Sequence, residues 1–147
     1  MFKHILIPTD GSELSDKAIS AGIEFAREVR ARVTGFTAVP EYRVPSQVEL
    51  MSRHGQSLEQ YERAARVQAE AALQKIADRA RAAGVAYDAE YVQSDQPYEA
   101  IVRTALKCGC DLIFMASHGR RGMSALLHGS QTQGVLTHSA IPTLVYR

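Results

Sequence analysis

The sequence contains no tryptophan, and it has no apolar run near the ~18 residues that a membrane-spanning helix needs. Its N-terminus, MFKHILIPTD, lacks the apolar segment and cleavage site of a secretory signal peptide. Neither sign of charge is in excess, because 17 basic residues face 16 acidic ones. No global field therefore recruits nucleic acid or an anionic membrane. We expect a cytoplasmic protein with neither partner.

Cysteine is also scarce. Cys108 and Cys110, in KCGCD, are too close together for an easy disulfide and too few for a zinc site. We interpret them as reduced packing residues. The alternative, a reactive thiol pair of low pKa, needs a positive neighbour or a helix N-terminus, and Lys107 is the only nearby candidate.

The familiar nucleotide-binding fingerprints are missing as well. The chain has no G-x-x-x-x-G-K-[ST], and no G-x-G-x-x-G follows its first strand-like segment. No metal-ligand cluster is visible in the sequence either. Any anion site must be built locally by another route.

What the sequence does contain is a regular alternation of strand and helix patterns. With 147 residues and 46% hydrophobic content, it fits a single domain, 1–147, that can bury a sizeable core. Short apolar or alternating runs predict strands, and apolar residues three or four apart predict helices. The predicted strands are 4–8, 32–39, 85–92, 111–116 and 143–146. The predicted helices begin after Ser12, at Ser57 (ending at Gly84), at about Tyr98 and before Val135.

This order predicts an α/β fold with a doubly wound parallel sheet and helices on both faces. Ligands of such sheets bind at the carboxyl ends of the strands. The loops to examine are therefore PTDGS after the first strand, AVPEY after the second and MASHGRRGMSALLHGS after the fourth.

Two other segments have plainer interpretations. Residues 40–55 carry two prolines and no sustained periodicity, so we interpret them as an irregular connector, either a lid or a surface loop. The helix from Ser57 mixes both signs of charge along its polar face. A solvated face fits this pattern better than an RNA or membrane surface.

The loop after the fourth strand has the composition of a phosphate site. Glycines let successive N–H groups converge on an anion, and a helix N-terminus adds unpaired donors and partial positive charge. In the alternative interpretation the glycines only shape a turn and the arginines are solvated. The residues concerned are His118, Gly119, Arg120, Arg121, Gly122, Gly129 and Ser130.

Asp10 and Ser117 each have a competing role. Asp10 ends the first strand and suits sugar hydroxyls or a metal, although it could equally cap the turn into the next helix. MASHG is similar to the nucleophile elbow G-x-S-x-G, with Ser117 as nucleophile, but the first glycine is missing. Asp111 also precedes Ser117 rather than following it. We therefore interpret Ser117 as a loop donor.

The chain resembles the universal stress protein family along its whole length. The resemblance is carried by ILIPTDGSELSDKAI, by DLIFMASHGRRGMSALLHGSQTQGVL and by the closing IPTLVYR. The nucleotide-binding branch of that family has the motif G-x-x-G, nine residues, then G-[ST]. Here Gly119 is the second glycine, Gly129 and Ser130 close the motif, and Ala116 stands where the family has its first glycine.

The resemblance implies a Rossmann-like sandwich, similar to the adenine nucleotide alpha hydrolases, with strand order 3-2-1-4-5. It also implies ATP or AMP as ligand, often with Mg²⁺ or Mn²⁺, and a homodimer through the C-terminal strand. By position, Asp10 would hold the ribose and backbone near Val39 would face the adenine. The implied nucleotide site comprises Pro8, Thr9, Asp10, Val39, Met115, Ala116, Ser117, His118, Gly119, Arg120, Gly129, Ser130, Gln131 and Thr132.

Within that site, the backbone of Ala116 would face the ribose. The phosphates would lie on main-chain N–H groups and on the Ser130 hydroxyl. If Ala116 needed a positive φ, its methyl group would cost about 1 kcal/mol or more. With an ordinary φ, it would only crowd the ribose.

The predicted function is that of a stress-response regulator or sensor that binds an adenine nucleotide. No general base stands beside the γ-phosphate, so we predict no catalytic residues and at most slow ATP hydrolysis. The alternatives are a dimeric interaction module with a vestigial pocket and a small hydrolase acting through Ser117.

Overall fold

The computed structural model of the chain describes residues 1–118 and 129–147. Its centre is a sheet of five parallel strands in the order β3-β2-β1-β4-β5, which confirms the predicted fold class and strand order. The predicted site residues Gly119 and Arg120 lie outside the described residues, as do Arg121 and Gly122. The strands are β1 (His4–Pro8), β2 (Arg32–Val39), β3 (Tyr87–Gln93), β4 (Leu112–Ala116) and β5 (Thr143–Tyr146).

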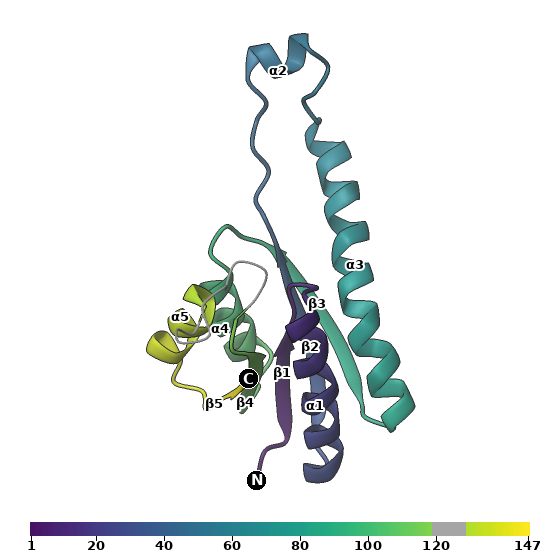
Figure 1. The fold of residues 1–147 in the computed structure, drawn as a ribbon, viewed down its shortest axis with the longest axis vertical. Coiled ribbons are helices and arrows are strands. Elements are labelled where there is room, and N and C mark those ends of the chain that lie inside the picture. The colour runs from purple at the N-terminus through teal and green to yellow at the C-terminus, as the bar shows by residue number, and fades with distance from the viewer. Residues whose placement is uncertain (119–128) are drawn as a thin grey trace.

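Helices cover both faces of this sheet. One face carries α1 and α3, and the opposite face carries α4 and α5 (Figure 1). The helices are α1 (Glu13–Val29), α2 (Gln47–Met51), α3 (Leu58–Ala83), α4 (Pro97–Lys107) and α5 (Ser130–His138). Among the described residues, no helix combines the length and the apolarity that crossing a bilayer requires.

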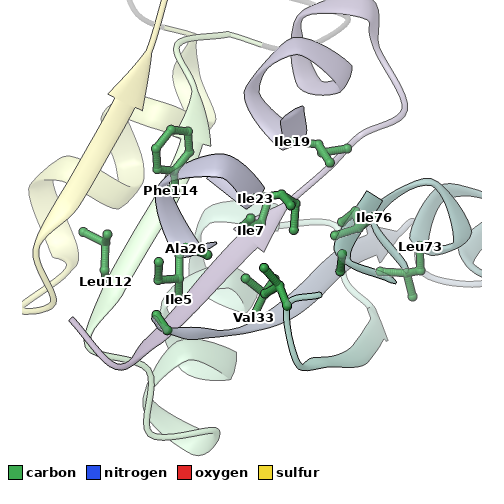
Figure 2. Packing of buried hydrophobic residues seen from close by; sticks show 13 residues of the cluster. Ile5, Ile7, Ile19, Ile23, Ala26, Val33, Leu73, Ile76, Leu112 and Phe114 are labelled. Atoms are coloured by element: carbon green, nitrogen blue, oxygen red, sulfur yellow. The ribbon is translucent and has the colours of Figure 1, made fainter. Parts of the chain in front are cut away.

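The core consists of two apolar layers, one on each side of the sheet. Successive strand residues point to opposite faces, so Ile5 and Ile7 of β1 pack beneath α1 while Leu6 packs beneath α4. Figure 2 shows the first layer, in which Ile19 and Ile23 of α1 lie over β1. Because both faces are buried, β1 needs an unbroken apolar run and not an alternating one.

The helix ends follow the predicted signals. The Ser12 side chain accepts a hydrogen bond from the Ser15 amide and begins α1, whereas Gly84, with φ 68°, ends α3 in the left-handed conformation that glycine adopts without strain. On the polar face of α3, Arg63 pairs with Glu59 and Arg81 with Asp78 at exposed positions. This is the solvated face that the charge pattern predicts.

Both cysteines are free thiols. Cys110 is buried in the layer beneath α4, and burial raises its pKa to about 12. Burial also raises the pKa of Cys108. A thiol whose pKa is raised is a poor nucleophile near neutral pH, so the structure supports the packing interpretation of the pair.

The prediction of an irregular connector over residues 40–55 was wrong in one respect. The segment contains α2, which begins with a capping box: the Ser46 hydroxyl accepts from the Glu49 amide, and the Glu49 carboxylate accepts from the Ser46 amide. A helix of five residues is too short to show a 3.6-residue period. With the first turns of α3, this segment extends well beyond the sheet (Figure 1). We call residues 40–64 the arm.

At the opposite, amino-terminal edge of the sheet, His4 of β1 is buried in a polar cluster. Its Nδ1 lies 3.0 Å from Nη2 of Arg32, and its Nε2 lies 2.7 Å from Oγ1 of Thr34. Arginine can only donate, so Nδ1 accepts and Nε2 carries the proton. Burial is the main cause that lowers the pKa of His4, and the Arg32 guanidinium adds to it.

This lowered pKa predicts that the protein loses stability in mild acid. Since the unfolded chain binds a proton to His4 more readily than the folded chain does, the free energy of unfolding should fall as the pH drops below about 6.5. The His4→Gln variant should show a flatter dependence between pH 8 and pH 5, measured by urea denaturation. His54→Gln, which removes an exposed histidine, is the matched control and should keep the wild-type slope; equal slopes for all three proteins would contradict the prediction.

Candidate functional site

The carboxyl ends of β1 and β2 form one side of the candidate site. The Thr9 amide donates to the Phe36 carbonyl at 2.8 Å, and the Thr37 hydroxyl donates to the Thr9 carbonyl at 2.8 Å. Asp10 follows at the exposed edge, where its Oδ1 accepts from the Ser12 amide at 2.9 Å and from the Ser15 hydroxyl at 2.8 Å. Asp10 therefore contributes to the turn into α1, the capping role considered for it, while its carboxylate stays at the surface.

The end of β4 and the start of α5 form the other side. The Thr132 hydroxyl donates to the Ala116 carbonyl at 3.0 Å, and the Gly129 amide donates to the Ser117 carbonyl at 2.9 Å. A Cβ at Gly129 would lie 3.1 Å from Cα of His118, which is tighter than ordinary van der Waals contact. The close approach of these two backbones explains why the position suits glycine.

Ala116 adopts ordinary strand geometry. Among the described residues other than glycine, only Arg30 and Arg53 have a positive φ. Alanine in place of the first glycine of the G-x-x-G motif therefore adds no left-handed strain at the end of β4. What remains is a methyl group on a residue that is 7% exposed.

The N-terminus of α5 has the features of an anion site. Its N-cap is Gly129, and in the described part of the chain no side chain caps it. The first-turn amides of a helix have no intrahelical acceptor, so those of Ser130 and Gln131 are available donors. The Gly129 amide is not available in the same way, because it already donates to the Ser117 carbonyl.

The predicted site residues thus divide into two groups. Pro8, Thr9, Val39, Met115, Ala116, Ser117 and Thr132 are buried and hold the strand ends together. The side chains or backbone that a ligand can reach belong to Asp10, His118, Gly129, Ser130 and Gln131.

The backbone of β2 makes Ala38 a candidate that sequence reasoning missed. The Val39 carbonyl accepts from the Ser94 amide at 2.8 Å, so it faces β3. Backbone groups alternate in direction along a strand, and the Phe36 carbonyl faces β1. Ala38 therefore faces the β1 side too, but β1 ends opposite Phe36. The ladder register, which no composition or spacing shows, places the Ala38 backbone toward the site.

A second missed residue, Tyr98, connects α5 to α4. The Gln131 side-chain oxygen accepts from the Tyr98 amide at 2.7 Å and so caps the first turn of α4. The Tyr98 ring lies against Gly134, where a Cβ would come within 2.4 Å of Cγ of the ring, and 5.2 Å from the His138 ring. These contacts fix the direction of the α5 N-terminus relative to the sheet.

The serine-hydrolase alternative gains little from this geometry. Oγ of Ser117 lies 3.1 Å from Nδ1 of His118, but Ser117 is only 6% exposed. No contact between His118 and a carboxylate occurs within residues 1–118 and 129–147, so the third group of a triad is absent there. The pair serves the end of β4 as a local hydrogen bond.

The described residues offer no protein-only metal centre. Across residues 1–118 and 129–147 there is no group of three or more His, Cys, Asp or Glu side chains placed to hold an ion. Asp10 follows β1, the strand that lies beside β4 in the sheet. A divalent ion here would depend on phosphate oxygens for most of its ligands.

Comparisons with known proteins agree along the whole chain. Residues 1–147 match the Universal stress protein family. A universal stress protein of Methanocaldococcus jannaschii is 30% identical over 156 residues, which cover 100% of this chain and 83% of the relative. One from Thermus aquaticus is 31% identical over 151 residues, which cover 100% of both chains.

Solved structures show the same fold. UspA from Lactobacillus plantarum has a TM-score of 0.81 at 20% identity, covering 99% of this chain and 98% of that one. A universal stress protein in complex with cAMP has a TM-score of 0.71 at 22% identity, with 99% and 97% covered. One from Archaeoglobus fulgidus in complex with dAMP has a TM-score of 0.68 at 14% identity, with 100% and 98% covered.

The contact between Tyr98 and Gly134 predicts an unusual response to a helix-favouring substitution. Alanine normally stabilises a helix relative to glycine by up to ~1 kcal/mol, but Gly134→Ala should destabilise the protein by about 1–3 kcal/mol through overpacking. In a Tyr98→Ala background the same substitution should be neutral or stabilising. Chemical denaturation of the four proteins measures the coupling, and an equal effect of Gly134→Ala in both backgrounds would refute this role of the ring.

Proposed function

The chain belongs to the universal stress protein family, and from this premise we propose that it binds an adenine nucleotide, ATP or AMP, at the carboxyl edge of its sheet. The observation that carries the proposal is that the α5 N-terminus, which no side chain of the described residues caps, and the Asp10 carboxylate follow the neighbouring strands β4 and β1 at that edge. Two structures of similar fold, solved with cAMP and dAMP, support the choice of an adenine nucleotide.

The phosphates belong at the N-terminus of α5. The amides of Ser130 and Gln131 and the Ser130 hydroxyl supply neutral donors, and the helix dipole adds partial positive charge. Gly129 contributes by its small size, because its backbone packs against His118 and closes the loop. Gly119 and Arg120, which the resemblance adds to the phosphate site, lie outside the described residues.

The ribose and the adenine belong on the β1 and β2 side. The Asp10 carboxylate suits ribose hydroxyls, because an ionised acceptor makes hydrogen bonds that are about twice as strong as neutral ones. The backbone at Ala38, next to the predicted Val39, faces the space beyond β1 and suits the polar edge of an adenine ring. Because Ala116 has no positive φ, we expect its methyl group to permit nucleotide binding and to weaken it only by crowding the ribose.

A regulatory role suits this site better than rapid catalysis. Neither Asp10 nor His118 is a poised general base, since Oδ1 of Asp10 holds the turn into α1 and Nδ1 of His118 lies against Ser117. Hydrolysis of bound ATP should therefore be slow. A bound nucleotide would act as a signal, and Mg²⁺ or Mn²⁺ would enter with its phosphates.

We predict that Asp10→Asn weakens nucleotide binding without unfolding the protein. Asparagine keeps an oxygen for the Ser12 amide but loses the charge, so the Kd for ATP and AMP should rise about ten- to a hundredfold. Isothermal titration calorimetry of the wild type and the variant measures the change, and mass spectrometry of ligand released from freshly purified protein identifies the natural nucleotide.

Asp78→Asn is the matched control for this titration. Asp78 is an exposed carboxylate on α3, remote from the site, and its removal should leave the Kd unchanged. Absence of binding heat with the wild type, together with no released nucleotide, would favour the interaction module with a vestigial pocket.

A second proposal concerns β5, which lies at the edge of the sheet with half-buried side chains. An edge strand presents unpaired backbone groups that can pair with a second copy. We predict that, at low protein concentration, Leu144→Glu lowers the molar mass measured by light scattering from that of a dimer to that of a monomer. Lys107→Glu, an exposed change on α4, controls for altered charge, and a mass unaffected by Leu144→Glu would reject this interface.

A further inference from the structure

The arm, residues 40–64, is a long segment that contributes one side chain to the core, the half-buried Tyr61 at its base. None of its 25 residues is buried. In Figure 1 it projects along the longest axis of the molecule, with α2 at its tip. It nevertheless carries a cluster of exposed apolar side chains: Val44 (83% exposed), Val48 (75%), Leu50 (57%), Met51 (85%) and Leu58 (51%).

Local contacts give the arm a defined shape. The Tyr42 hydroxyl donates to the Gln56 carbonyl at 2.8 Å, which joins the segment before α2 to the segment after it. The Tyr61 hydroxyl donates to the Pro40 carbonyl. The Tyr42 and Tyr61 rings lie 5.5 Å apart. Capping boxes begin both α2 and α3. These contacts hold the arm extended and keep its apolar side chains away from the sheet.

Such contacts do not account for the arm by themselves. Isolated helices of this length are marginal in water, and most helical stability in proteins comes from burying an apolar face. α2 has five residues and buries none of them. Clustered exposed apolar side chains mark a surface that a partner covers. The exposed apolar side chains of the arm therefore suit one side of a protein–protein interface.

We propose that the arm packs against the arm of a second copy of this chain. Its charges are nearly balanced and interspersed, so it neither repels its own copy nor selects a strongly charged partner. In a contact with two-fold symmetry, each pairing of an acidic residue on one copy with an arginine on the other copy occurs twice. The arm's 25 residues also match the 20–30 that each partner contributes to a stable interface. Its charged residues are Glu41, Arg43, Glu49, Arg53, Glu59, Glu62 and Arg63.

The same charges argue against a lipid surface. Membrane-surface helices place lysine and arginine on the polar face beside their apolar residues. The arm has no lysine, its acidic residues outnumber its arginines, and Glu49 lies directly between Val48 and Leu50. The arm contact is also separate from pairing at β5, because the tip of the arm and β5 lie far apart along the longest axis (Figure 1).

The test uses the full-length chain with Leu144→Glu, so that edge-strand pairing does not mask the arm. We expect this protein to sediment as a dimer at high concentration. Adding Val48→Glu and Met51→Glu should weaken the association at least about tenfold and yield monomers. Val67→Glu, on α3 outside the arm and 62% exposed in the native chain, is the matched control and should keep the dimer. Circular dichroism checks that each variant is folded.

Photo-crosslinking from position 51 supplies the second measurement. The chains carry a photo-crosslinking residue in place of Met51 and are otherwise wild type. In a mixture of ¹⁵N-labelled and unlabelled copies, we expect cross-links between the arms of different copies. Cross-links confined to one chain would overturn the proposal. So would a Leu144→Glu protein that stays monomeric at every concentration, or whose mass is unaffected by the arm substitutions. Monomers that float with vesicles of phosphatidylcholine and phosphatidylserine would assign the apolar cluster to lipid and likewise overturn it.

Discussion

The burial of both faces of β1 is the constraint on which the rest of the molecule depends. An isolated parallel strand cannot bury Ile5, Leu6 and Ile7 at once, so helices must cover both sides of the sheet. Each crossover then returns the chain to the same amino-terminal edge. All strand ends consequently meet at one carboxyl-terminal edge, where polar residues collect because the ladder stops there.

The candidate site shows how little of such an edge is free for a ligand. The buried hydroxyls of Thr37 and Thr132 donate to the carbonyls of Thr9 and Ala116. The Gly129 amide donates to the Ser117 carbonyl. The exposed groups of this edge include the Asp10 carboxylate, which also holds the turn into α1, and the N-terminus of α5. The nucleotide that we propose as ligand suits these groups, because it is polar along its whole length and anionic at one end.

Periodicity predicted the parts of this fold that pack against the sheet. Three of these signals depend only on a few neighbouring residues, so the sequence alone reveals them. They are the apolar run of β1, the N-cap of α1 at Ser12 and the C-cap of α3 at Gly84. The sequence did not predict α2, because a helix of five residues with no buried side chain shows no helical periodicity. The contact between Tyr98 and Gly134 depends on how α4 packs against α5. The direction of the Ala38 backbone depends on the register between β1 and β2. Sequence spacing contains no such information.

The hydrogen bond from the Gly129 amide to the Ser117 carbonyl has a consequence for how this chain tolerates changes between those two residues. It joins the two ends of residues 118–129 at the sheet, so the strand before and the helix after are held whatever connects them. Lengthening a loop between fixed ends is cheap, about 0.6 kcal/mol for each doubling. The number of residues between Ser117 and Gly129 can therefore change at little cost in stability. Substitutions between Ser117 and Gly129 should therefore alter this edge of the sheet while β4 and α5 keep their positions.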